Sequence, residues 1–386
     1  MNSLSAANTR FAFDLFQQFK TSKKGDNIFF SPLSISSALA MTYLGAKENT
    51  ALEIGKVGVY FLHRSPVEKM ENVHHQFQKL LTELKKPTDA YELNMANKFY
   101  GEKKYQFLQE YMDNIKKFYL ASVESVDFNN AAEESRKKIN SWVESQTNEK
   151  IKDMFPKDSL NHTILVLVNA VYFKGQWDTK FDTKNTVEKE FWLDKDTSKP
   201  VQMMRQSNVF NFTSLEDLQA KILEIPYKGK DLSMMLLLPH ENHVSYSLFP
   251  LLQLEDQLTA EKLIEWTSSQ NMSNGQVDLY LPRFKVEESY ELKATLKALG
   301  MVDAFNTKSA NFSGMTGRQD LVVSKVRHKS FVEVTEEGTE AAASTDVEVI
   351  AKSAPIYPFH CDHPFLFFIK HNKTNSILFL GRVSSP

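Results

Sequence analysis

The sequence predicts an α+β domain in which most of the helices precede most of the strands. Apolar residues recur at helical spacing through the first 150 residues, whereas runs of apolar and β-branched residues dominate from about residue 161 onward. Helices gathered before strands are typical of α+β folds and not of alternating α/β folds. No segment rich in Pro, Gly or Ser divides the 386 residues, so we expect a single domain over residues 1–386.

The helical half has recognisable starts and faces. The apolar residues from Phe11 to Phe19 follow one face of a first helix. The pair Ser31-Pro32 predicts the start of another helix, because serine caps the free amide groups of a first turn and proline fits within that turn. A further helix is predicted over about residues 136–144, with its apolar residues on one face.

The strand half consists of apolar runs bounded by turn residues. We predict strands over residues 164–173, 232–238, 277–286, 331–335 and 365–370. In the third of these runs the residues that face inward change phase across Pro282, which indicates a bulge or an edge strand.

Charge and cysteine content exclude several classes of function. The 46 Lys and Arg residues nearly balance the 48 Asp and Glu residues, so the net charge of −2 gives no electrostatic reason to bind nucleic acid or an anionic membrane. The single cysteine, Cys361, allows no intramolecular disulfide and favours a reducing compartment. We find neither a signal peptide nor a run of about 20 apolar residues. We expect a soluble cytoplasmic protein, with release by a leaderless route as the alternative.

Motifs of common enzymes and metal sites are missing from the sequence. It contains no GxSxG, GxGxxG or GxxxxGKS/T motif. The run from His360 to His363 contains two histidines, a cysteine and an aspartate, but consecutive residues of an extended segment point to alternate sides and do not surround one ion. We therefore expect no enzyme activity, no cofactor and no metal. We interpret this run as packing residues, and His74 with His75 as surface residues.

The segment from Glu336 to Phe359 is the most unusual part of the sequence. It exceeds 20 residues without helical periodicity, and loops of this length inside a compact domain are mostly functional or disordered. From Thr339 to Val349 every second residue is small or β-branched, while the residues between them are mostly polar or charged. This alternation predicts a strand with one buried face inside a segment that otherwise resembles an exposed loop. An ordinary half-buried strand is the alternative.

Four motifs resemble those of the serpin family, in the same order along the chain. Residues 27–35 resemble its strand-to-helix motif near the amino terminus, residues 169–177 a central strand of its main sheet, and residues 359–369 its carboxy-terminal signature. Residues 337–343 resemble the hinge of inhibitory members, and they are Glu337, Gly338, Thr339, Glu340, Ala341, Ala342 and Ala343. Within the family the chain is similar to the ovalbumin-type intracellular branch, clade B, and most similar to the squamous cell carcinoma antigens. It departs from them around the reactive bond.

This resemblance implies a fold and a mechanism. Helices would pack on a large central mixed sheet accompanied by two smaller sheets, and the exposed reactive loop would span about residues 336–359. Serpins present this loop to a protease as a substrate, form an acyl-enzyme, and insert the cleaved loop into the central sheet as a new strand. The expected function is therefore a monomeric suicide inhibitor of proteases. The alternative is a non-inhibitory serpin that acts as a binding, chaperone or storage protein.

Counting from the hinge as in the family places the cleaved bond between Lys352 and Ser353. A lysine before the bond suits trypsin-like serine proteases, whose specificity pocket holds an acidic residue. Papain-like cysteine proteases instead select a bulky apolar residue two places before the bond. For them the alternative register is cleavage after Ala351, which puts Ile350 in that place.

The resemblance also implies a set of buried residues that control sheet opening. Ser31, Ser34, Asn169 and His328 fall where the family keeps a polar cluster beneath the part of the sheet that opens. The simpler interpretation is that these are buried polar residues with satisfied hydrogen bonds, which is compatible with that role.

Overall fold

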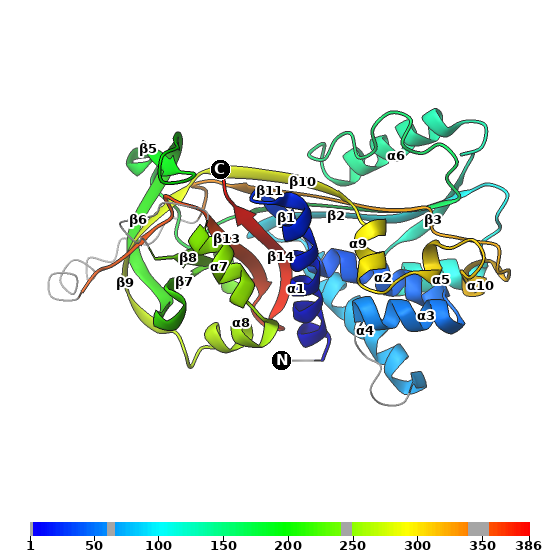
Figure 1. The fold of residues 1–386 in the computed structure, drawn as a ribbon, viewed down its shortest axis with the longest axis horizontal. Coiled ribbons are helices and arrows are strands. Elements are labelled where there is room, and N and C mark those ends of the chain that lie inside the picture. The colour runs from blue at the N-terminus through cyan, green and yellow to red at the C-terminus, as the bar shows by residue number, and fades with distance from the viewer. Residues whose placement is uncertain (1–2, 60–65, 241–248, 339–354) are drawn as a thin grey trace.

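The computed structural model describes residues 3–59, 66–240, 249–338 and 355–386 (Figure 1). Its helices are α1 (Ser3–Lys23), α2 (Pro32–Gly45), α3 (Glu48–Ile54), α4 (Pro66–Leu84), α5 (Gln109–Tyr119), α6 (Ala132–Gln146), α7 (Phe249–Gln257), α8 (Ala260–Trp266), α9 (Lys293–Ala298) and α10 (Ser313–Thr316). Its strands are β1 (Ile28–Phe30), β2 (Tyr91–Glu102), β3 (Ser122–Val126), β4 (Leu165–Gly175), β5 (Val187–Trp192), β6 (Ser198–Leu215), β7 (Ala220–Pro226), β8 (Leu232–Pro239), β9 (Ser273–Pro282), β10 (Phe284–Glu291), β11 (Lys325–Val334), β12 (Tyr357–His360), β13 (Phe365–His371) and β14 (Ser376–Val383).

The predicted α+β class is confirmed, but the division into a helical half and a strand half is too simple. Strands β2 and β3 both lie within the first 150 residues. The second half of β2 is buried and carries Lys98 and Glu102 among its buried residues. Because this strand is covered on both sides and includes charged residues, its sequence lacks the alternation that marks a half-buried strand.

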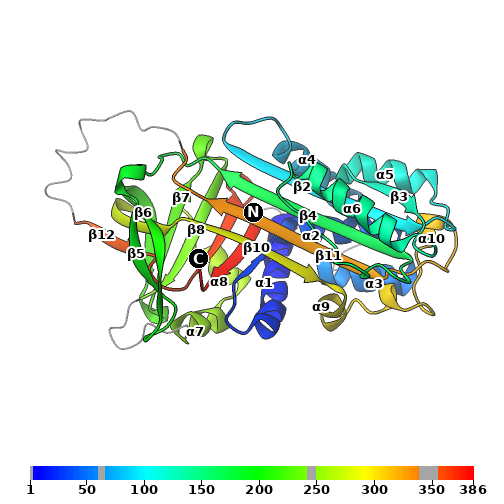
Figure 2. The same ribbon diagram turned by 90° about the horizontal axis from the view of Figure 1, so that it is seen from above.

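The described strands form two hydrogen-bonded sheets. The five-stranded sheet has the order β10-β11-β4-β2-β3, and the nine-stranded sheet has the order β1-β14-β13-β8-β7-β6-β9-β12, with β5 paired to β6. The family resemblance implied two smaller sheets beside the central one, whereas here their strands join into one continuous path. Figure 2 shows the long strands of the five-stranded sheet side by side, with α6 lying across them.

The apolar run over residues 277–286 is two strands and not one. Strand β9 ends at Pro282 in the nine-stranded sheet, and β10 begins at Phe284 as the edge of the five-stranded sheet. Only Arg283 lies between them. The change of phase across Pro282 therefore marks the point at which the chain passes from one sheet to the other.

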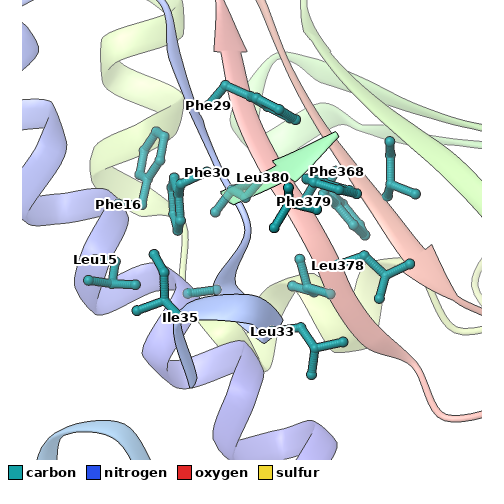
Figure 3. Packing of buried hydrophobic residues seen from close by; sticks show 14 of the residues in the cluster. Leu15, Phe16, Phe29, Phe30, Leu33, Ile35, Phe368, Leu378, Phe379 and Leu380 are labelled. Atoms are coloured by element: carbon teal, nitrogen blue, oxygen red, sulfur yellow. The ribbon is translucent and has the colours of Figure 1, made fainter. Parts of the chain in front are cut away.

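The predicted helix start at Ser31-Pro32 is confirmed, and this turn lies in the hydrophobic core against the nine-stranded sheet. Pro32 is the first residue of α2, and the Ser31 hydroxyl oxygen accepts a hydrogen bond of 3.2 Å from the amide of Ser34. Around this turn, apolar side chains of α1, β1 and α2 pack against β13 and β14 (Figure 3). Phe29 stacks between Phe367 and Phe379, with ring centroids 5.7 Å and 5.3 Å away.

The structure also places two of the histidines that the sequence analysis discussed, His74 and His363. His74 is only 4% exposed and lies beside the rings of Phe118 and Tyr119, so the prediction that it is a surface residue is wrong. His363 bonds to the Asp362 carboxylate and to the Pro239 carbonyl, both at 2.8 Å.

Among the described residues, no three His, Cys, Asp or Glu side chains are grouped to hold a metal ion. Within the same residues, no helix is long and apolar enough to cross a membrane.

Candidate functional site

The candidate site is the end of the five-stranded sheet where the segment from Glu336 to Phe359 leaves β11. Residues 339–354 lie outside the described residues, and with them Ile350, Ala351, Lys352 and Ser353, and the hinge residues from Thr339 to Ala343. The described ends of the segment are Glu336–Gly338, directly after β11, and Pro355–Phe359, which leads into β12 (Figure 2). The contacts that fix the first of these ends define the site.

Trp177 fixes the first end. Its indole Nε1 donates to the carbonyl of Thr335 at 2.8 Å, and its backbone amide donates to the carbonyl of Glu337 at 3.0 Å. The ring is 1% exposed and stacks on Tyr227, with the ring centroids 4.6 Å apart. Because Trp177 follows β4 and Thr335 follows β11, these bonds join the ends of two neighbouring strands.

The hinge glycine lies where no side chain fits. Gly338 forms a parallel bridge with Trp177. A Cβ atom added to Gly338 would come within 2.7 Å of the Trp177 carbonyl oxygen and 2.9 Å of the Lys180 Cα. These are backbone atoms, which move only if the chain moves. The close approach of two main chains therefore requires glycine at this position.

A buried carboxylate holds the start of the segment on its other side. Glu336 is 6% exposed and accepts bonds from Arg283 Nε at 3.1 Å, Arg283 Nη2 at 2.5 Å and Thr186 Oγ1 at 2.9 Å. Burial alone would raise the pKa of Glu336, but hydrogen bonds from Arg283, its own backbone and Thr186 lower it below the usual range. The carboxylate is therefore charged at neutral pH and ties the segment to the link between β9 and β10.

An open cavity of about 1140 Å³ lies beside this contact. Charged side chains of both signs line it, among them Lys180, Arg283, Lys285, Glu333 and Glu336. The segment thus leaves the sheet next to an open cavity and not next to packed core.

Strands β4 and β11 are parallel neighbours in the middle of the five-stranded sheet. Their pairing runs from Lys325 opposite Val166 at one end to Glu333 opposite Lys174 at the other. Parallel pairing is slightly less stable per residue than antiparallel pairing. The other neighbours of these two strands, β2 and β10, are both antiparallel to them.

The structure brings the four predicted polar residues together across this pair. Asn169 of β4 is opposite His328 of β11, and His328 Nδ1 lies 2.6 Å from Asn169 Oδ1. Asn169 Nδ2 donates to Ser34 Oγ at 2.7 Å, and the amide of Ser31 donates to His328 Nε2 at 3.1 Å. All four residues are at most 3% exposed. Side chains from both strands thus share one hydrogen-bond network with the first turn of α2.

Two buried histidines predict acid sensitivity. Burial lowers the pKa of His328 to about 3, and burial together with His75 lowers that of His74 to about 4. In the unfolded chain both would titrate near 6.5. The unfolded state therefore binds more protons below that pH, and stability is lost as the pH falls from about 6.5 toward 4, by up to about 1.4 kcal/mol per pH unit for each histidine.

We expect the thermal midpoint of the uncleaved protein to fall across this window, as calorimetry would show. The variant His74→Gln, which removes one of the two titrating groups, should lose stability less steeply. A midpoint that stays constant between pH 7 and pH 5 would contradict this account of the two histidines.

Comparison with known proteins identifies the family. The family model described as Serpin (serine protease inhibitor) matches residues 6–386. The chain belongs to the serpin family. It is 63% identical over 402 residues to Serpin B4 of Homo sapiens, with all of both chains covered, in agreement with the resemblance to the squamous cell carcinoma antigens.

Two solved serpin structures share the fold over the full length of both chains. A structure of uncleaved ovalbumin has a TM-score of 0.91 and 40% sequence identity. A loop-inserted structure of a cleaved ovalbumin mutant has a TM-score of 0.86 and 38% identity. Relatives of this serpin are therefore known both in an uncleaved form and in a cleaved, loop-inserted form.

Sequence reasoning missed the residues that hold Glu336–Gly338 after β11. Trp177 was part of a matched motif but was not predicted as a site residue. The pairing of Arg283 with Glu336 had no local signal, because the two residues are 53 positions apart. The one usable signal was the position of Arg283 directly after the phase change at Pro282. The polar cluster, by contrast, was assigned through the family resemblance.

Proposed function

We propose that this serpin traps trypsin-like serine proteases as a suicide substrate. The catalytic serine oxygen of the protease attacks the carbonyl carbon of Lys352, the bond to the Ser353 nitrogen breaks, and that nitrogen leaves as an amine with the proton from the serine. The product is an ester between the protease and Lys352. Water hydrolyses this ester unless the loop first inserts between β4 and β11 and carries the protease away.

The observation that carries the proposal is the place of the hinge. Gly338 is bridged to Trp177 just beyond the paired ends of β4 and β11, so the residues that follow it start at the point where an inserted strand would enter between these two strands. From Thr339 to Lys352 there are 14 residues, which as a strand would span about 45 Å. The 11 residues of β4 and the 10 of β11 offer partners for most of that length.

The polar cluster supports the same mechanism. Inserting a strand requires breaking the pairing of Asn169 with His328, which are joined by a short hydrogen bond and tied to α2. We assign to Ser31, Ser34, Asn169 and His328 the role of a latch that holds the two strands together before cleavage.

The family resemblance and the loop sequence also suggest a second class of target protease and the conditions under which the serpin acts. We assign papain-like cysteine proteases as a second target class, through cleavage after Ala351 with Ile350 in the pocket that selects bulky apolar residues. The serpin acts as a cytoplasmic monomer, without a cofactor or metal, and does not bind nucleic acid or membranes.

Incubation with trypsin tests the proposal. We expect a complex that survives SDS, and a released carboxy-terminal fragment that mass spectrometry finds to begin at Ser353. Lys352→Glu should abolish the complex, because a glutamate is repelled by the acidic specificity pocket. Lys308→Glu, an equal charge change at an exposed position, should leave complex formation unchanged.

Two outcomes would count against the proposal. Clean cleavage after Lys352 without any stable complex would favour a non-inhibitory serpin. A trypsin fragment that begins at another residue would show that the bond has been assigned wrongly.

A further inference from the structure

A cluster of cations surrounds one tyrosine on the exposed side of β5, β6, β9 and β12. The Nζ atom of Lys189 lies 4.2 Å from the centre of the Tyr280 ring, and the Arg205 guanidinium lies 5.2 Å from it. The His360 ring stacks on the same tyrosine, with the centroids 4.2 Å apart and an angle of 29° between the planes. We name Lys189, Arg205, Tyr280 and His360 the Tyr280 face.

One carboxylate fixes two members of the Tyr280 face. Asp278 accepts a bond of 3.0 Å from Arg205 Nε and lies 3.3 Å from His360 Nε2. The register places Arg205 opposite Tyr280, and Tyr280 opposite His360, so the side chains form a row across three strands. Side chains already held in one arrangement lose little conformational entropy when a partner binds.

The face keeps an excess of positive charge and remains open to solvent. Arg205 is 53% exposed along its side chain, and Lys189 is also exposed. Among the described residues, no carboxylate pairs with Lys189, so Asp278 balances only one of the two permanent cations.

One member of the Tyr280 face, His360, is close in sequence to the proposed cleaved bond. Ser353 precedes His360 by seven residues, which span at most about 25 Å when extended. A protease domain of about 240 residues has a radius of gyration of about 18 Å, and therefore a diameter above about 40 Å. A protease bound at Lys352 would extend over the start of β12 and the strands next to it.

We propose that the Tyr280 face is a second contact for the protease, which binds an acidic surface patch of the enzyme while the loop occupies its active site. This inference rests on the proposed function. Complementary charge would speed association and favour proteases with acidic surfaces over basic ones with the same specificity pocket. Lys352 in the loop would thus select proteases that cleave after lysine, and the Tyr280 face would discriminate among these proteases by their surface charge.

Two trypsins of opposite net charge test the inference. Anionic and cationic trypsin both cleave after lysine, and anionic trypsin with its catalytic serine replaced by alanine reports docking alone. We expect Lys189→Glu with Arg205→Glu to weaken docking of the inactive anionic trypsin about tenfold at 50 mM salt, and much less at 500 mM salt. The association rate with active anionic trypsin should fall similarly, while the rate with cationic trypsin should not fall.

Lys104→Glu with Lys117→Glu is the matched control, because it also replaces two exposed cations by glutamate. The Nζ atom of Lys104 also lies over a tyrosine ring, 5.1 Å from the centre of Tyr105, and Lys104 follows β2 where β2 pairs with β3. Figure 2 shows β3 at the opposite end of the molecule from β12. This variant should change docking less than twofold.

Equal docking by the double variant, the control and the unmodified protein would overturn the inference and would show that the cluster only stabilises the sheet. Failure of the proposed function has a different signature, because the unmodified protein would then form no SDS-stable complex with either trypsin. Docking of the inactive enzyme does not depend on that step, so the two failures are distinguishable.

Discussion

Replacing Thr339 with arginine should turn the inhibitor into a substrate. Thr339 is the first of the alternating small residues and directly follows Gly338, so it must be buried before the others can follow. A guanidinium buried there without a carboxylate partner would cost several kcal/mol. An increase of about 1.4 kcal/mol in the insertion barrier already slows that step tenfold. Hydrolysis would then release the protease first.

Glu340→Arg is the control for this variant. It introduces the same side chain one position later, where the alternation places it toward solvent. With trypsin we expect Thr339→Arg to be cleaved completely without an SDS-stable complex, and Glu340→Arg to form the complex almost normally. Equal behaviour of the two variants would show that the period of two in this loop does not describe the inserted strand.

Cleavage of the loop should raise the thermal midpoint by tens of degrees. Insertion would replace the parallel contact between β4 and β11 with a new strand that is hydrogen-bonded on both sides. In a domain of this size about 1 kcal/mol changes the midpoint by only a few degrees. A rise of tens of degrees therefore requires a large gain in stability, which only a change of the whole sheet would supply.

Calorimetry on the intact serpin and on the serpin cleaved after Lys352 measures this difference. The intact control should be treated with inactivated protease, so that only the cleaved bond differs. An unchanged midpoint after complete cleavage would mean that the loop stays outside the sheet, and the non-inhibitory alternative would then be favoured.

Local signals in the sequence were sufficient where a feature depends on neighbouring residues. The turn at Ser31-Pro32 was predictable because the cap and the first turn lie within four residues. The buried strand β8 was predictable from its continuous apolar run, and all of its residues are buried. The period of two after Gly338 is equally local, and it motivates the insertion mechanism.

Features that depend on register were not predictable in this way. Arg283 and Glu336 meet because β10 and β11 are neighbours, and the Tyr280 face forms because three strands from distant parts of the chain align one row of side chains. His74 was misplaced for a related reason, since its burial depends on α5 packing against α4. Strand order and helix packing are set by the whole chain and leave no local pattern.

A disulfide across β4 and β11 tests most directly the central claim that these strands must separate. Lys174 and Glu333 are register partners at the end nearest the loop, and neighbouring strands lie about 4.8 Å apart, within the range that a disulfide spans. Cys361 is buried and should not interfere. With trypsin, we predict that Lys174→Cys/Glu333→Cys is cleaved without a stable complex when oxidised and forms the complex again when reduced. A stable complex of the oxidised variant, with the disulfide verified by mass spectrometry, would contradict the account.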